Sequence, residues 1–72
     1  MKQYYVLTWQ YWETNKHRWG RAIHIYTDKQ TRDEHLKNLC PCIHEYPKTF
    51  EQTYTDEEIA EFLLKEEYCI HL

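Results

Sequence analysis

The tripeptide Cys-Ile-His occurs twice in the sequence, at residues 42–44 and 69–71, and it offers thiols and imidazoles that could bind a metal. Residues two apart in a β-strand lie on the same face of a sheet, so each copy would present its Cys and its His together. If the two segments were neighbouring strands, the four ligands of a Cys₂His₂ zinc site would converge. The candidate ligands are Cys42, His44, Cys69 and His71, with Cys40 able to replace one of them.

These cysteines and histidines also fit a protein without a metal. Zinc modules usually contain a Cys-x₂₋₄-Cys pair, whereas one residue separates Cys40 from Cys42. Free cysteines are among the most frequently buried residues, and they pack as small hydrophobic side chains. We therefore expect no cofactor, and a zinc-stabilised interaction module is the alternative that these residues leave open.

The sequence does not predict an enzyme. A Cys–His catalytic pair needs backbone N–H groups that stabilise an oxyanion, and a chain with a single glycine offers no glycine-rich turn to supply them. Serine is absent, which excludes serine hydrolysis. The sequence also contains no phosphate-binding loop, no dinucleotide-binding fingerprint and no His-Glu-x-x-His motif.

Aromatic and basic residues gather around a polar turn predicted at residues 13–18. Trp, Tyr and Arg supply most hot spots of protein interfaces, and rings beside cations also suit single-stranded nucleic acid. A third interpretation is that the rings simply pack in the interior. The net charge of −3 favours a protein partner over a nucleic acid. The candidate anchors are Trp9, Trp12, Arg18, Trp19 and Arg21.

The charge is unevenly distributed along the chain. Residues 1–40 contain seven Lys or Arg and four acids, whereas residues 41–72 contain two Lys and eight acids. The acids of the second half either form a solvated helix face or occupy a basic groove of a partner. Compact size, no catalytic motif and an acidic face are typical of inhibitors that phages and mobile elements encode against nucleic-acid-handling or defence complexes. The candidate acids are Asp56, Glu57, Glu58 and Glu61.

The pattern predicts one α+β domain over residues 1–72, with elements in the order β-β-α-β-α. A hairpin over residues 3–26 begins a small, mainly antiparallel sheet, and two short helices near 29–39 and 55–67 pack on one of its faces. Residues 31–34 and 55–58 fit helix capping boxes, although Asp28 could begin the first helix one turn earlier.

Later segments are less regular. Pro41 ends the first helix, and Pro47 separates a short strand over residues 42–46 from a β-rich segment over 49–54. Residues 68–72 form either a last helical turn or a closing strand. The expected core consists of Val6 or Leu7, Ile23, Ile25, Leu36, Leu39, Phe50, Ile59, Phe62 and Leu63.

Composition sets the remaining expectations. A chain of 72 residues can bury only a small apolar surface in its core. Its three Trp, seven Tyr and two Phe increase that buried surface. Apolar residues on both faces of the first strand fit a homodimer or a second layer of helix. The sequence shows no signal peptide and no membrane-length apolar run, and its cysteine count is odd, so we expect a cytoplasmic protein.

Overall fold

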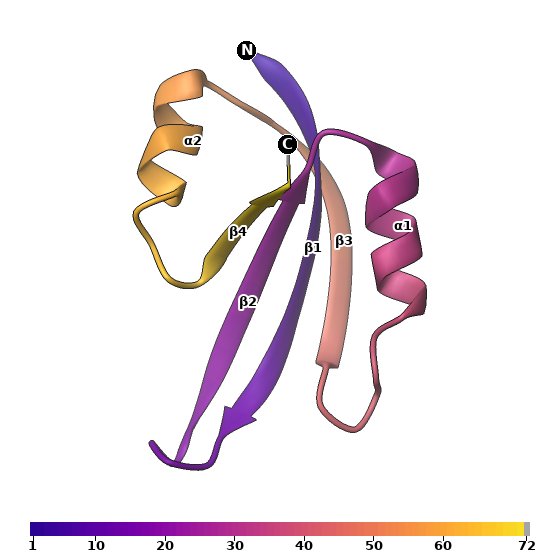
Figure 1. Ribbon diagram of the computed structural model, residues 1–72, viewed down its shortest axis with the longest axis vertical. Helices are drawn as coiled ribbons and strands as arrows, with labels where there is room; N and C mark the ends of the chain where they lie inside the picture. The colour runs from indigo at the N-terminus through magenta and orange to yellow at the C-terminus, as the bar shows by residue number, and fades with distance from the viewer. Residues whose placement is uncertain (72) are drawn as a thin grey trace.

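The computed structural model describes residues 1–71 and contains a four-stranded mixed sheet with two helices (Figure 1). The strand order across the sheet is β3-β1-β2-β4. The predicted α+β class and the N-terminal hairpin are confirmed, and a closing strand extends the predicted order. The elements are β1 (Lys2–Glu13), β2 (Arg18–Tyr26), α1 (Lys29–Lys37), β3 (Glu45–Tyr54), α2 (Asp56–Phe62) and β4 (Tyr68–His71).

The hairpin of β1 and β2 forms the centre of the sheet. The two strands are antiparallel, with Val6 opposite Ile25 and Trp12 opposite Trp19. Both strands are rich in β-branched and aromatic residues, which fit a pleated surface. β3 pairs antiparallel with the outer side of β1, and β4 pairs parallel with the outer side of β2.

β3 is one continuous strand, so the predicted interruption at Pro47 is wrong. β3 lies at the edge of the sheet, where a residue without an N–H group costs no ladder hydrogen bond if it faces outward. The register against β1 shifts between Thr8 and Gln10. Tyr46 lies at this irregularity with a left-handed φ of 51°, as in a β-bulge.

The two helices cover opposite faces of the sheet, which corrects the prediction that both pack on one face. Successive strand residues point to opposite faces, and Val6 and Leu7 are both fully buried. Val6 packs in a cluster with Ile59 of α2, whereas Leu7 packs in a cluster with Leu36, near the end of α1. We call these two sides of the sheet the α2 face and the α1 face.

The helix boundaries follow their caps. Asp28 caps α1, because its carboxylate accepts a hydrogen bond from the Thr31 N–H at 2.9 Å, so the predicted box over residues 31–34 does not begin the helix. Thr55 and Glu58 form the predicted capping box of α2. Both helices are shorter than predicted, and α2 ends at Phe62 rather than near residue 67.

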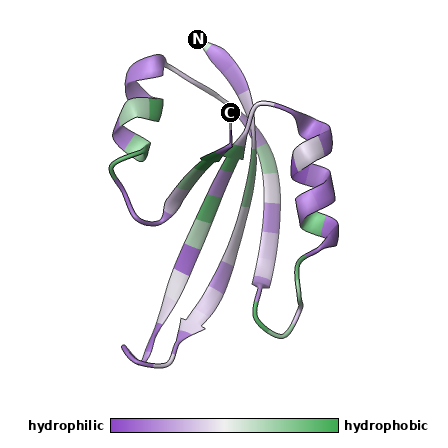
Figure 2. Cartoon of the chain, in the orientation of Figure 1, coloured by the Kyte–Doolittle hydropathy of each residue, from purple (hydrophilic) through white to green (hydrophobic). Residues whose placement is uncertain are grey.

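The core is more aromatic than expected. Tyr4, Trp9 and Tyr26 are buried together with four predicted core residues, Val6, Leu7, Ile25 and Ile59. The predicted core residues Ile23, Leu36, Leu39 and Phe62 are only partly buried, and Phe50 and Leu63 are 44% and 60% exposed. Figure 2 shows hydrophobic residues gathered along α2 and where β2 meets β4, and more hydrophilic ones toward the hairpin turn. Neither helix in residues 1–71 has the length and hydrophobicity of a membrane span.

Candidate functional site

The two Cys-Ile-His segments do not pair, so the condition under which their four ligands would converge is not met. Residues 41–43 form a turn rather than a strand, and β4, which carries Cys69 and His71, pairs with β2. His44 makes a local contact instead, in which its Nδ1 accepts a hydrogen bond from the Cys40 N–H at 2.8 Å.

The thiols of Cys40 and Cys42 lie near each other in this turn. A hydrogen bond with Cys40 raises the pKa of the Cys42 thiol, so the thiol form is favoured over the thiolate that binds metals. Cys42 and Cys69 are both exposed. The three cysteines therefore do not form one ligand set.

Three histidines from three different elements do converge on the α1 face. His24 comes from β2, His35 from α1 and His71 from β4. One ring nitrogen of each lies within 4.8 Å of a ring nitrogen of each of the other two. His24 Nδ1 and His71 Nε2 are 2.7 Å apart and share a hydrogen bond. We call these residues the histidine cluster.

Neighbouring aromatic side chains hold the histidine cluster in place. The His24 ring stacks on Trp9 with centroids 4.6 Å apart, and the His71 ring stacks on Tyr26 at 4.3 Å and 7°. The Tyr26 hydroxyl is hydrogen-bonded to His35 Nδ1. Each imidazole is thus fixed by a packed ring or a hydrogen bond, and all three are only partly exposed.

Burial favours the neutral forms of the His24 and His71 imidazoles. Burial, with smaller contributions from His71 and His35, lowers the pKa of His24 to about 4. Burial also lowers the pKa of His71. Neutral imidazole keeps a lone pair on one nitrogen, and this is the form that binds metals or accepts protons.

Of the histidine cluster, sequence reasoning singled out His71 alone. The period of two placed His24 on the same side of its strand as Tyr26, and the predicted helix over 29–39 included His35. The missing information was the pairing of β4 with β2, which brings His71 beside Tyr26. Parallel pairing of segments about 45 residues apart leaves no local signal in a single sequence.

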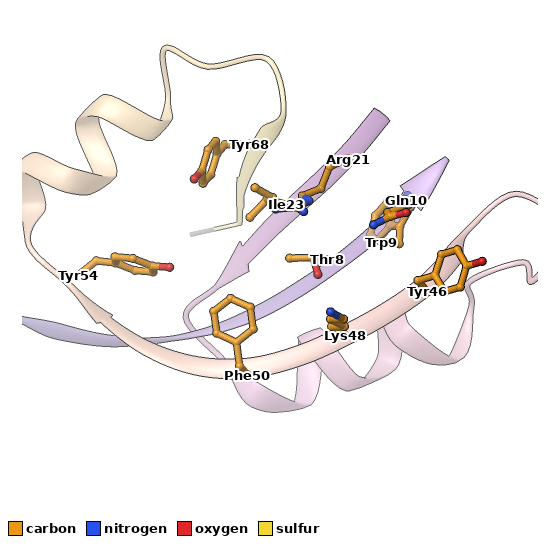
Figure 3. A pocket seen from close by; sticks show the side chains of 10 residues that line it. All are labelled: Thr8, Trp9, Gln10, Arg21, Ile23, Tyr46, Lys48, Phe50, Tyr54 and Tyr68. Atoms are coloured by element: carbon orange, nitrogen blue, oxygen red, sulfur yellow. The ribbon is translucent and has the colours of Figure 1, made fainter. Parts of the chain in front are cut away.

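The α2 face contains a second candidate site. It lies on the part of the sheet that α2 leaves uncovered, because the helix covers only one end of this face. Beyond the helix, a groove of about 310 Å³ lies along the exposed part of the sheet (Figure 3). Lys48 lies between Tyr46 and Phe50 on β3, and Arg21 extends from β2 next to Ile23. The residues that line the groove are Thr8, Trp9, Gln10, Arg21, Ile23, Tyr46, Lys48, Phe50, Tyr54 and Tyr68.

Exposed aromatic rings continue from this groove to the hairpin turn. Trp12 and Trp19 contact each other edge to face with centroids 5.6 Å apart, and Trp19 approaches Tyr46 at 6.3 Å. These three side chains are 48%, 49% and 64% exposed. Together with Phe50 they form what we call the aromatic patch.

Trp9 does not belong to the aromatic patch, which corrects its prediction as an exposed anchor. It is only 8% exposed and lies in the core on the α1 face, packed against His24. Alternation along β1 separates it from Trp12, because residues three apart in a strand point to opposite faces.

The predicted charged residues lie in two separate places. Arg18 pairs with Glu13 at 2.8 Å, whereas Arg21 and Lys48 form no ion pair within residues 1–71. The candidate acids are all exposed on α2, and Glu58 is engaged in the capping box. The structure therefore brings Trp12, Trp19 and Arg21 together, and it keeps the acids apart from them.

The chain matches no protein-family model, no curated protein and no solved structure.

Proposed function

We propose that this protein is a non-enzymatic binding protein that uses the aromatic patch and the adjoining groove to occupy a surface of a larger protein partner. The observation that carries the proposal is the exposure of Trp12 and Trp19, each close to one half. A chain this short has little apolar surface to leave in water, so a partner that covers these rings would account for them.

The chemistry of the patch suits a protein interface. Aromatic rings and arginine are the side chains that most often carry binding energy at interfaces, and Arg21 lies beside the rings without an ion-pair partner in residues 1–71. Arg21 and Lys48 would meet carboxylates of the partner near the groove. The expected partner surface therefore combines apolar side chains with acidic ones.

The acidic side chains of α2 would supply a separate contact with a basic region of the same partner. Asp56, Glu57 and Glu61 are exposed and form no ion pair within residues 1–71. Complementary charge speeds encounter between proteins. A partner that handles nucleic acid would present such a basic region, and blocking it is how a phage-type or mobile-element-type inhibitor would act. Because Cys40, Cys42 and Cys69 are free thiols, we place this activity in the cytoplasm.

A second candidate function is binding of single-stranded nucleic acid. The observation that favours it is that exposed rings share one open sheet face with Arg21 and Lys48, two cations that form no ion pair within residues 1–71. Bases could stack on the rings while phosphates meet the two cations. The net charge of −3 and the acids on α2 oppose this alternative.

Affinity capture from an extract of the native cell tests the first proposal. The wild-type protein should retain a specific partner, the Trp12→Ala/Trp19→Ala variant should lose it, and Leu64→Ala should keep it. Leu64 is the matched control because it is apolar and 87% exposed but lies outside the patch. Equal capture by all three proteins would contradict the proposal.

Two further experiments test the role of the acids and the nucleic-acid alternative. Charge reversal by Glu57→Lys/Glu61→Lys should slow association with the captured partner, and no effect would remove the acids from the interface. Titration with a dT oligonucleotide should leave the tryptophan fluorescence unchanged. Quenching that weakens steeply with added salt would favour the nucleic-acid alternative instead.

A further inference from the structure

We propose that the histidine cluster is a binding site for one divalent transition-metal ion of the zinc class, with His24, His35 and His71 as its ligands. The site is independent of the aromatic patch, since it lies on the other face of the sheet. It also differs from the predicted cysteine-containing set, with which it shares only His71.

The donor set selects the kind of ion. Imidazole nitrogen is a borderline donor that suits zinc, copper, nickel and cobalt, whereas calcium and magnesium require oxygen ligands. Three histidines around one ion are a known arrangement for zinc, and they leave a fourth position for water or another donor. Among residues 1–71, no cysteine or carboxylate joins the three histidines in this cluster.

The spacing of the nitrogens is close to what a bound ion requires. Zinc–nitrogen bonds of about 2.0–2.1 Å in a tetrahedral site place neighbouring nitrogens roughly 3.3 Å apart. The hydrogen-bonded nitrogens of His24 and His71 lie 2.7 Å apart, and every pair in the cluster lies within 4.8 Å. Small rotations of partly exposed rings would bring all three to the bonding distance, and the ion would replace the proton that His24 and His71 share.

The surroundings supply an outer hydrogen-bond partner for one of the three proposed ligands, His35. Histidine ligands of metals nearly always donate their other N–H group to a neighbouring oxygen, which fixes the orientation of the ring. The Tyr26 hydroxyl is hydrogen-bonded to His35 Nδ1, so Nε2 of that ring would be the atom that binds the ion. Tyr26 is thus a positioning residue for His35.

The ion would connect three elements that meet only at the sheet edge. β4 has four residues and is the last strand of the sheet, and the His35 ring of α1 lies 6.1 Å from the His71 ring of β4, measured between centroids. Binding free energy available only in the folded protein adds to its stability. Tying α1 to β2 and β4 would therefore compensate for the small core.

The test is calorimetric titration of chelator-treated protein with Zn²⁺. We expect one ion per chain, with affinity reduced at least about 100-fold in His24→Ala and in His35→Ala, because even outer-layer substitutions cost roughly 10–100-fold. His17→Ala is the matched control, since His17 is exposed in the hairpin turn and should bind as the wild type does. Cys40→Ser/Cys42→Ser should also leave the affinity unchanged.

Two measurements on wild-type protein avoid variants that fold poorly. Addition of Co²⁺ should produce the visible absorption of a site with nitrogen ligands and no thiolate-to-metal band. In NMR spectra, the ring signals of His24, His35 and His71 should shift with Zn²⁺ while those of His17 stay in place. Absence of stoichiometric binding, thiolate ligation, or unchanged ring signals of the three histidines would overturn the proposal.

Discussion

At the scale of single residues, the environment separates side chains of the same type into different roles. Trp9 is buried in the core, whereas Trp12 and Trp19 are about half exposed on the opposite side of the sheet. Histidines differ in the same way, because His17 lies in an exposed turn and His24 is stacked on Trp9. Alternation along the strands determines which of these side chains reach the interior and which reach the surface.

The Tyr26 hydroxyl should influence metal affinity through His35. If zinc binds the histidine cluster, Tyr26→Phe should lower its affinity roughly 10-fold or more, because His35 loses the hydrogen bond that orients it. Calorimetric titration measures this, and chemical denaturation of the metal-free variant shows whether its stability has changed. Unchanged zinc affinity in Tyr26→Phe would exclude Tyr26 as a positioning residue.

At the scale of elements, the sheet is organised around β1, which contributes to the core on both faces. Val6 and Leu7 are adjacent in sequence and completely buried on opposite sides. α1 closes one side, and α2 closes part of the other. The second helix layer accounts for the two apolar faces of β1 that also suggested a homodimer.

Removal of a β1 core side chain should therefore destabilise the whole fold. We expect Leu7→Ala to lower the free energy of unfolding by about 3 kcal/mol, through lost burial and the cavity that remains. Leu64→Ala, at a side chain that is 87% exposed, should change it by less than about 0.5 kcal/mol. Urea denaturation followed by circular dichroism compares the two variants, and similar losses would contradict this description of the core.

The sequence was most informative where structure is local. The hairpin, the capping box of Thr55 and Glu58, and the β-rich character of residues 49–54 follow from neighbouring residues, and they were predicted. Pro47 misled because its effect depends on whether the strand is central or at an edge, and that is a property of the finished sheet.

The candidate sites depended on long-range pairing, which a single sequence does not contain. Trp12, Trp19 and Arg21 could be grouped because one hairpin contains all of them. The histidine cluster could not, because it needs β4 beside β2 and the His35 side chain of α1 near both strands. The repeated Cys-Ile-His tripeptide suggested that residues 42–44 pair with residues 69–71. Two segments with the same residues need not be neighbours in the fold.

At the scale of the whole molecule, the two sheet faces carry different chemistry. The α1 face holds the histidine cluster beneath a helix, and the α2 face leaves the aromatic patch open beyond its shorter helix. Exposed acids lie on α2, and Arg21 and Lys48, which form no ion pair within residues 1–71, lie along the groove. This division would let a small chain combine the proposed metal site on one face with the proposed contact surface on the other.

Site-specific photo-crosslinking in the native cell tests the central proposal most directly. A photoreactive residue placed at Trp19 should form a covalent product with one protein partner, identified by mass spectrometry, and the same residue placed at Leu64 should not. The yield at position 19 should fall sharply when Trp12→Ala is added. A product formed equally from both positions, or none from position 19, would contradict the aromatic patch as the binding surface.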